Sequence, residues 1–334
     1  MTEPLLSVRS LCVDYEQRRP SVFGSRASTL RAVNDISFEL CEGETLGIVG
    51  ETGCGKTSLG KAILQLVPPA AGRVLWRGVD LAHADPKTLT KLRSELQIVF
   101  QDPLSALNPR MPVGEIVAEP LRVHAADMSA RERQAAVADI FVRVGLRPEM
   151  TGRYPNEFSS GQCQRISIAR AMITRPKLLI CDEPVSALDV SIQAQICNLL
   201  RRLQRETGIA ILFISHDLSV LRYMSHRVMV LYLGRLMEIA PRDELFENPR
   251  HPYSRALIEA IPVADPDLGP LDAADALPGE IPSALEPPSG CVFRTRCPIA
   301  TPECARTRPP GESVSASHRV ACHHWREARP RPRQ

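Results

Sequence analysis

The octapeptide Gly50–Thr57 has the sequence Gly-Glu-Thr-Gly-Cys-Gly-Lys-Thr and matches the phosphate-loop pattern G-x-x-x-x-G-K-[ST] at every position. An apolar run of strand length, Leu46–Val49, precedes the loop, and apolar residues recur after it at helical spacing, at Leu59, Ala62, Ile63 and Leu66. This order of strand, glycine turn and helix is the context in which such a loop binds phosphate. We therefore expect an α/β fold built around a nucleotide.

In such a loop the backbone N–H groups surround the β-phosphate, the Lys56 ammonium neutralises β and γ oxygens, and the Thr57 hydroxyl binds Mg²⁺. Cys54 is interpreted as a small residue at a variable position rather than as a redox-active thiol. The nucleotide-binding residues expected from this part of the chain are Gly50, Glu51, Thr52, Gly53, Cys54, Gly55, Lys56, Thr57 and Ser58.

Two further apolar runs, Leu178–Cys181 and Ala210–Ile214, have the continuous hydrophobicity of parallel strands that are buried on both faces. Asp182 and Glu183 follow the first run, and His216 follows the second. Because parallel strands end at the same edge of a sheet, these side chains should lie beside the phosphate loop. We expect Asp182 to hold Mg²⁺ through water, Glu183 to polarise the attacking water, and His216 to contact the γ-phosphate.

Two other residues have less certain geometry. Gln101 follows the run Gln97–Phe100 and is placed to sense Mg²⁺ and the attacking water. Tyr15 precedes the first core strands, where its ring either stacks on adenine or packs within a strand. Because the neighbouring insert at residues 17–29 leaves the position of Tyr15 open, both interpretations stand.

The segment Phe158-Ser-Ser-Gly-Gln-Cys-Gln-Arg165 lies between the phosphate loop and the acidic pair. It cannot reach the nucleotide bound by its own phosphate loop, so it indicates a site that a second subunit completes. We expect ATP to lie between two chains.

The rest of the chain divides by pattern. Helical spacing predicts an insert at about residues 102–175, with one helix opened by Ser129 and another capped at Ser159 and Ser160. A glycine turn at Gly234 separates two apolar runs and predicts a hairpin. After about Pro262 the composition shifts to Pro, Ala, Asp and Glu, which predicts a first domain at residues 1–262 and a small loop-rich domain at residues 263–334.

Composition excludes several classes of protein. A net charge of +3 in 334 residues is too small to argue by itself for binding to nucleic acid, because acidic and basic residues nearly cancel. No apolar run approaches the roughly 20 residues that cross a bilayer, and the first residues lack the pattern of a signal peptide. We therefore expect a cytosolic location, with docking on a membrane partner left open.

Four of the ten cysteines fall in the last part of the chain with the spacing C-x₅-C-x₆-C-x₁₇-C. A loop-rich segment with few large apolar residues has little else to bury, so four thiolates there suggest a metal centre. Spacing alone does not choose between zinc and iron–sulfur. Arg294 and Arg296 either offset the charge of such a centre or are plain surface residues. The expected ligands are Cys291, Cys297, Cys304 and Cys322.

With these motifs in this order, the chain resembles the ATPase subunit of an ABC transporter. Three further segments look like the oligopeptide/dipeptide (peptide/nickel) importer branch, namely Gln101–Arg110, Cys181–Gln195 and Asn248–Ser254. The resemblance implies an ABC-type P-loop domain with a helical insert, plus a small cysteine-ligated C-terminal domain that holds a 4Fe-4S cluster, with Zn²⁺ as the alternative.

The resemblance also assigns roles and partners. Lys56, Gln101, Glu183 and His216 would carry hydrolysis, Thr57, Gln101 and Asp182 would bind Mg²⁺, and Asp189 would lie in the loop that links two ATP sites. The residues that would close on the partner's nucleotide are Ser159, Ser160, Gly161 and Gln162. The partners implied are a second ATPase subunit, in a homodimer or heterodimer, two permeases and an extracytoplasmic solute-binding protein. The segment Leu104–Pro120 would receive a permease helix, which places the chain at the cytoplasmic face of the inner membrane.

One departure from the family signature is Ser160, where a glycine is usual, because a side chain there either crowds the partner's γ-phosphate or adds a hydrogen bond. The expected function is ATP hydrolysis that energises import of di- or oligopeptides. Nickel chelates, glutathione or another small solute are alternatives. A soluble ABC ATPase acting on nucleic acid is a different class, which the charge balance disfavours.

Overall fold

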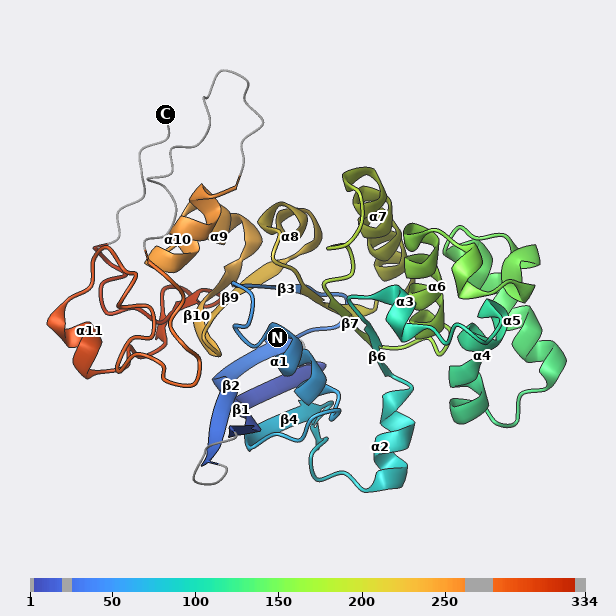
Figure 1. Ribbon diagram of the computed structural model, residues 1–334, viewed down its shortest axis with the longest axis horizontal. Coiled ribbons are helices and arrows are strands. Elements are labelled where there is room, and N and C mark those ends of the chain that lie inside the picture. Colours follow the sequence, from blue (N-terminus) through green and yellow to red (C-terminus); the bar gives the residue numbers. More distant parts are fainter. Residues whose placement is uncertain (1–2, 20–25, 262–278, 328–334) are drawn as a thin grey trace, which may run out of the picture.

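The computed structural model describes residues 3–19, 26–261 and 279–327. Its larger sheet has eight strands in the order β11-β12-β10-β9-β3-β8-β7-β6 (Figure 1). The strands β3, β8, β7 and β6 are parallel, β9 is parallel to β3, and β10 and β12 complete one side in antiparallel pairs. Their bounds are β3 Thr45–Val49, β6 Leu96–Val99, β7 Leu178–Asp182, β8 Ala210–Ile214, β9 Arg227–Tyr232, β10 Arg235–Pro241, β11 Glu312–Ser313 and β12 Arg319–Val320.

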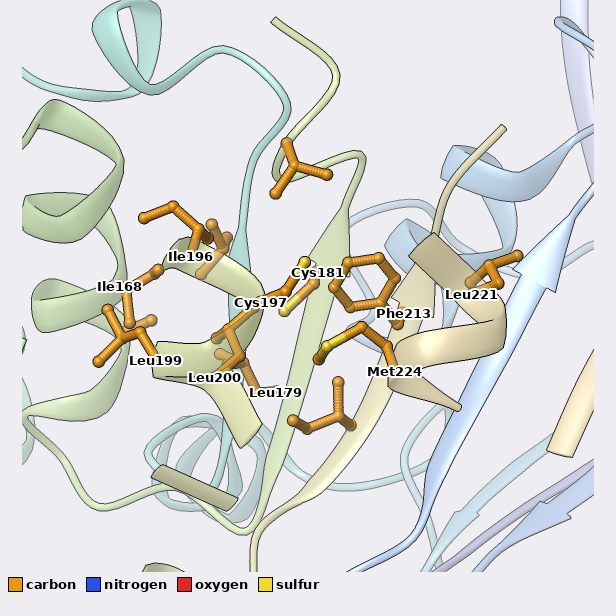
Figure 2. Close-up of a cluster of buried hydrophobic side chains, with 14 of the residues drawn as sticks. Ile168, Leu179, Cys181, Ile196, Cys197, Leu199, Leu200, Phe213, Leu221 and Met224 are labelled. Atoms are coloured by element: carbon orange, nitrogen blue, oxygen red, sulfur yellow. The ribbon is translucent and has the colours of Figure 1, made fainter. Parts of the chain in front are cut away.

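The central strands are buried on both faces, as their continuous apolar sequences predict. In β7, Leu178 and Ile180 belong to one hydrophobic cluster, whereas the alternate residues Leu179 and Cys181 belong to another. Figure 2 shows the second of these clusters, where side chains of β7 and β8 meet those of α6, α7 and α8. The parallel sheet therefore forms the middle layer of the molecule.

The hydrophobic cluster that contains Leu178 and Ile180 also includes side chains of a smaller antiparallel sheet of order β2-β1-β4-β5. Its strands are β1 Leu6–Arg19, β2 Arg26–Leu40, β4 Ala71–Trp76 and β5 Val79–Asp80. Strand β1 pairs with β2 along most of its length, and Tyr15 lies opposite Leu30 in this pairing. The helix α1, Lys56–Ile63, packs between this sheet and the central strands, so the phosphate loop lies where the two sheets approach each other.

Helices between residues 103 and 172 occupy one side of the molecule in Figure 1. Ser129 caps α5 and Ser159 caps α6, each in a reciprocal pair with the side chain three residues later, as the sequence predicts. The helices of this part are α3 Pro103–Ala106, α4 Val113–His124, α5 Ala130–Arg143, η1 Pro148–Gly152, η2 Pro155–Glu157 and α6 Ser160–Met172.

The remaining helices are α2 Pro86–Arg93, α7 Val190–Thr207, α8 Leu218–Met224, α9 Arg242–Glu247, α10 Pro252–Glu259 and α11 Pro302–Arg306. The predicted hairpin at Gly234 is confirmed by the pairing of β9 with β10. None of the helices in the described part of the chain is long and apolar enough to span a membrane.

The C-terminal segment is joined directly to the large sheet. Strand β12 pairs with β10, where Glu238 lies opposite Val320, and this pairing extends the sheet beyond the hairpin. The boundary expected between residues 262 and 263 lies outside the described residues.

A buried histidine ties this segment to the domain. His318 is 0% exposed and lies between Glu238 and Glu244, at 2.8 Å from Nε2 and 2.7 Å from Nδ1 respectively. Burial alone lowers the pKa of His318, but hydrogen bonds to the two carboxylates outweigh it and raise the pKa above its usual value. His251 beside it has a pKa lowered by burial to about 4, so His251 stays neutral above pH 5.

We expect His318→Gln to lower the free energy of unfolding by about 3–5 kcal/mol at pH 6, because two carboxylates lose a buried cationic partner. A raised folded-state pKa means that this contribution is complete below the unfolded value of about 6.5 and is lost as the pH rises through the folded value. Urea unfolding of parent and variant at several pH values measures it. If the difference in unfolding free energy between parent and variant stays constant from pH 5 to 9, His318 is not paired with the two glutamates as a cation. The exposed pair of His83 and Asp80 offers the control His83→Gln, which should change little.

Candidate nucleotide site

The phosphate loop runs from the end of β3 into the N-terminus of α1, where unpaired backbone N–H groups and the helix dipole favour an anion. Gly55 has φ +98°, and a Cβ there would lie 2.0 Å from the Ala32 carbonyl oxygen, so only glycine fits. The Lys56 Nζ donates to the carbonyl oxygens of Gly50 at 2.7 Å and Glu51 at 3.2 Å. The ammonium is therefore held within the loop.

The cysteine of this loop is buried. Cys54 is 3% exposed, and burial raises the pKa of its thiol. A protonated, enclosed thiol is a poor nucleophile, which favours the packing interpretation of Cys54 over a redox one.

Thr57 and Asp182 meet across the loop. The Thr57 hydroxyl donates to Asp182 Oδ1 at 3.0 Å, and Asp182 is 4% exposed. Burial raises the pKa of this carboxyl, while the hydrogen bond from Thr57 opposes the rise. A hydroxyl and a carboxylate in contact are oxygen ligands of the kind that Mg²⁺ prefers.

Three strand ends place polar side chains around one carboxylate oxygen. Gln101 Nε2, after β6, donates to Glu183 Oε2 at 3.1 Å, and His216 Nδ1, after β8, lies 3.4 Å from the same oxygen. Glu183 itself has φ +47°, a conformation that non-glycine residues rarely adopt and that recurs at functional sites. Its N–H donates to the Ile214 carbonyl at 3.0 Å, which anchors this strained residue to β8.

A cleft of about 470 Å³ brings most of the predicted residues together. The Tyr15 hydroxyl donates to Ser58 Oγ at 3.2 Å, so this tyrosine lies at the loop with its ring half-buried. Leu30 and Ala32 of β2 also line the cleft; they carry no sequence signal because they are ordinary apolar strand residues. The lining residues are Tyr15, Leu30, Ala32, Thr52, Gly53, Gly55, Lys56, Thr57, Ser58, Gln101, Glu183 and His216.

Five predicted residues lie away from this cleft. Ser159 and Ser160 are exposed at the start of α6, and Asp189 is exposed at the start of α7. Gly161 is buried, and a Cβ there would lie 2.6 Å from Ile192 Cγ2, so close packing of α6 against α7 requires glycine. Gln162 caps the same helix through its side-chain oxygen. These residues do not line the cleft of their own chain.

The contacts that hold Glu51 of the phosphate loop were not predicted from the sequence. Arg296 forms a two-pronged ion pair with Glu51, at 2.7 and 3.1 Å, and the Glu51 N–H donates to the Tyr253 hydroxyl at 3.0 Å. The prediction of a plain surface position for Arg296 was therefore wrong, because its side chain is 6% exposed and paired with an acid. Its other predicted role, offsetting the charge of a metal centre, stays a prediction. No local pattern signals the contact with Glu51.

The four C-terminal cysteines are free thiols. Burial, with a smaller effect from the neighbouring cysteines, raises the pKa of Cys297 to about 11 and of Cys322 to about 12. Within the described residues, no three His, Cys, Asp or Glu side chains are arranged to hold a metal ion. The expectation of a cysteine-ligated domain is therefore not supported by the arrangement of these side chains.

The fold and this cleft together define an ATPase of the ABC class. The ABC transporter family model matches residues 33–186, and the model of the oligopeptide/dipeptide transporter C-terminal region matches residues 237–304. The dimeric ATP-binding cassette MJ0796, in a post-hydrolysis state bound to ADP and Pi, covers 71% of this chain and 98% of its own, with a TM-score of 0.62 and 26% identity.

Curated relatives narrow the class. The oligopeptide transport ATP-binding protein OppF of Escherichia coli (strain K12) is 53% identical over 319 residues, which are 95% of each chain. The putative oligopeptide transport ATP-binding protein YkfD of Bacillus subtilis (strain 168) is 45% identical over 97% of each chain. The chain belongs to this family of ABC transporter ATP-binding proteins, and it is an ATP-hydrolysing subunit.

Proposed function

We propose that this chain hydrolyses ATP to drive the import of di- or oligopeptides through attached permeases. The proposal of ATP hydrolysis rests on one observation: Gln101 Nε2 and His216 Nδ1 both contact the same oxygen of Glu183, in the cleft that Lys56 also lines. The peptide solute is supported by the names of relatives with about half of their residues in common.

In this proposal each residue of the cleft has a separate role in ATP hydrolysis. Lys56 neutralises phosphate oxygens, and the Thr57 hydroxyl and Asp182 carboxylate would hold Mg²⁺, which would supply positive charge to the phosphates. Glu183 accepts the proton of the attacking water, while Gln101 fixes the orientation of its carboxylate. His216, which follows β8 on the other side of Glu183 from Gln101, donates to the γ-phosphate, where negative charge develops.

A second ATPase subunit completes the site. Ser159 and Ser160 are exposed at a helix start and therefore free to meet a nucleotide that another chain binds. Beside Asp189, the apolar side chain of Val190 is 81% exposed, which suits a surface that a partner covers. The exposed Ser160 side chain has room to adapt, so we propose that it adds a hydrogen bond rather than crowding the partner's γ-phosphate.

The permease is proposed to dock on the helical part. Leu104, in the segment Leu104–Pro120, is 52% exposed although apolar. A groove of about 550 Å³ lies between α4, α5 and η1, with Gly114 and Ala118 in its lining. Closure of two ATPases around ATP would move this groove, and with it a permease helix, at the cytoplasmic face of the inner membrane. A solute-binding protein would deliver the peptide on the other side.

Reconstitution tests the proposal directly. The chain, its partner ATPase and both permeases in proteoliposomes should take up a labelled dipeptide or tripeptide when ATP and the binding protein are supplied. Uptake of a nickel chelate or of glutathione, with no peptide uptake, would move the solute to one of the alternatives. Nucleic-acid-stimulated ATPase activity without any uptake would overturn the transport assignment.

For the C-terminal cysteines, we propose a 4Fe-4S cluster as the fully loaded state, in a small domain at residues 263–334. The support is that Cys291, Cys297 and Cys304 each add to the rise in the pKa of the Cys322 thiol, which requires them to lie near it, and that none of the four is in a disulfide. Soft thiolates suit iron–sulfur sites. Ligation would require the four thiols to lose their protons.

Anaerobic purification should therefore give about four irons and four sulfides per chain, with a charge-transfer absorption band. Replacing Cys304 by Ser should remove the band and lower the iron content, whereas Cys41→Ser, at a half-buried thiol in another part of the chain, should not. Zinc alone would select the alternative metal. No metal at all would leave four structural thiols and would remove the cluster.

A further inference from the structure

The C-terminal segment reaches the phosphate loop through one arginine. Arg296 Nη1 lies 2.7 Å from Glu51 Oε2, and Nη2 lies 3.1 Å from Oε1, although the two residues are 245 positions apart. The arginine side chain is 6% exposed and the glutamate 21%. Such a two-pronged pair in a partly buried setting fixes the direction as well as the position of the carboxylate.

An aromatic cluster holds both ends of this pair. Tyr232, Tyr253 and Phe293 pack with ring centroids 4.8 to 5.4 Å apart. Arg296 Nη1 also donates to the Tyr232 hydroxyl at 3.4 Å, and the Tyr253 hydroxyl accepts the N–H of Glu51. Glu51 is therefore restrained through its side chain by Arg296 and through its backbone by Tyr253.

The restraint extends to the lysine that meets the phosphates. The Glu51 carbonyl accepts a hydrogen bond from Lys56 Nζ at 3.2 Å, so the position of this one residue sets part of the ammonium's surroundings. Glu51 is also an acid in a loop that must bind a highly charged anion. The guanidinium beside it offsets a negative charge that would otherwise repel the phosphates.

We propose that Arg296 is a positioning residue of the nucleotide site, which holds Glu51 and neutralises it so that the loop accepts phosphate. The C-terminal segment is by this contact a structural part of the ATP site. The inference rests on the proposed assignment of Gly50–Thr57 as the phosphate-binding loop. Arg296 touches the loop, not the nucleotide.

Nucleotide binding by the purified full chain tests this, with fluorescent ATP as the probe. Arg296→Gln should raise the Kd for ATP by about tenfold, because it leaves the Glu51 charge uncompensated in the loop. Arg296→Lys keeps a positive charge but cannot make the bidentate contact with Glu51. Its Kd for ATP should therefore rise only about threefold.

The double variant Glu51→Gln with Arg296→Gln separates charge from folding. Removing both charges should return the Kd to within about threefold of the parent, since a matched pair of neutral groups leaves no unpaired charge. Arg294 donates to the backbone and hydroxyl of Ser289 in the same segment, so Arg294→Gln is the control and should bind ATP normally.

Three outcomes overturn the proposal. One is an unchanged Kd for Arg296→Gln, and another is a double variant that binds no better than this single variant. The third is an equal loss for Arg294→Gln, which would mean that the segment acts only through general stability. If Arg296→Gln does not fold, Arg296→Lys carries the test, because it keeps the positive charge but cannot form both contacts with Glu51, and a parental Kd in that variant would overturn the proposal. Loss of binding in Lys56→Ala alongside normal binding in all Arg296 variants would leave the loop assignment intact and remove only this inference.

Discussion

Replacing Glu183 by glutamine should lower the rate of ATP hydrolysis on the order of 10²- to 10⁴-fold, the usual contribution of a positioned general base. The amide keeps the size of the carboxylate, so the contact with Gln101 and the strained backbone at φ +47° remain possible. An amide cannot take the proton of the attacking water. ATP should therefore bind and stay bound, and two subunits should remain closed around it.

Phosphate release and retention of labelled ATP, measured on the same sample, test this result. Glu149, an exposed residue of η1 remote from the cleft, offers the matched control Glu149→Gln, which should hydrolyse ATP at the parental rate. Turnover of Glu183→Gln at the parental rate would remove Glu183 from the role of base. Turnover that fails because ATP no longer binds would instead assign Glu183 to the binding of nucleotide.

Lys56→Ala should weaken ATP binding by about 10²-fold or more, because a buried charge-assisted contact to phosphate is worth about 2–5 kcal/mol. Lys56 is 5% exposed and its ammonium is already bound by the loop's own carbonyl groups, so little conformational entropy is lost when a phosphate arrives. The loss should therefore appear in the Kd and not only in the rate.

Equilibrium binding of fluorescent ATP measures this effect. Lys91 is exposed on α2 and does not line the cleft, so Lys91→Ala is the matched control and should bind ATP as the parent does. Parental affinity in Lys56→Ala would mean that the nucleotide lies elsewhere. A thermal unfolding curve for each variant shows that the loss does not come from misfolding.

The parts of the fold that follow from local pattern were predictable. The parallel strands β7 and β8 are continuous apolar runs up to Cys181 and Ile214, and the residues Glu183 and His216, which follow these strands, line the cleft. The caps at Ser129 and Ser159 are short-range hydrogen bonds between residues three positions apart, so the sequence carries them in full. The positions of Glu183 and His216 beside the phosphate loop were predictable because parallel strands end at the same edge of a sheet.

Long-range contacts were not predictable in the same way. Arg296 looked like a charged residue in a cysteine-rich segment, and nothing near it in the chain names Glu51 as its partner. His318 has no local sequence signal that indicates its position, and it is buried between two glutamates that belong to β10 and α9. In both cases the partner is chosen by tertiary packing, which leaves no periodic signal in a single sequence.

Strand β12 has a consequence for how the protein is made. Until Arg319 and Val320 have left the ribosome, the free side of β10 is an open sheet edge of the kind that pairs with other chains. A chain that ends before residue 296 would carry this edge together with a loop that lacks its Arg296 support. The β10 edge and the Arg296–Glu51 pair are thus completed only after residues 296–320 have been synthesised, well after the phosphate loop itself.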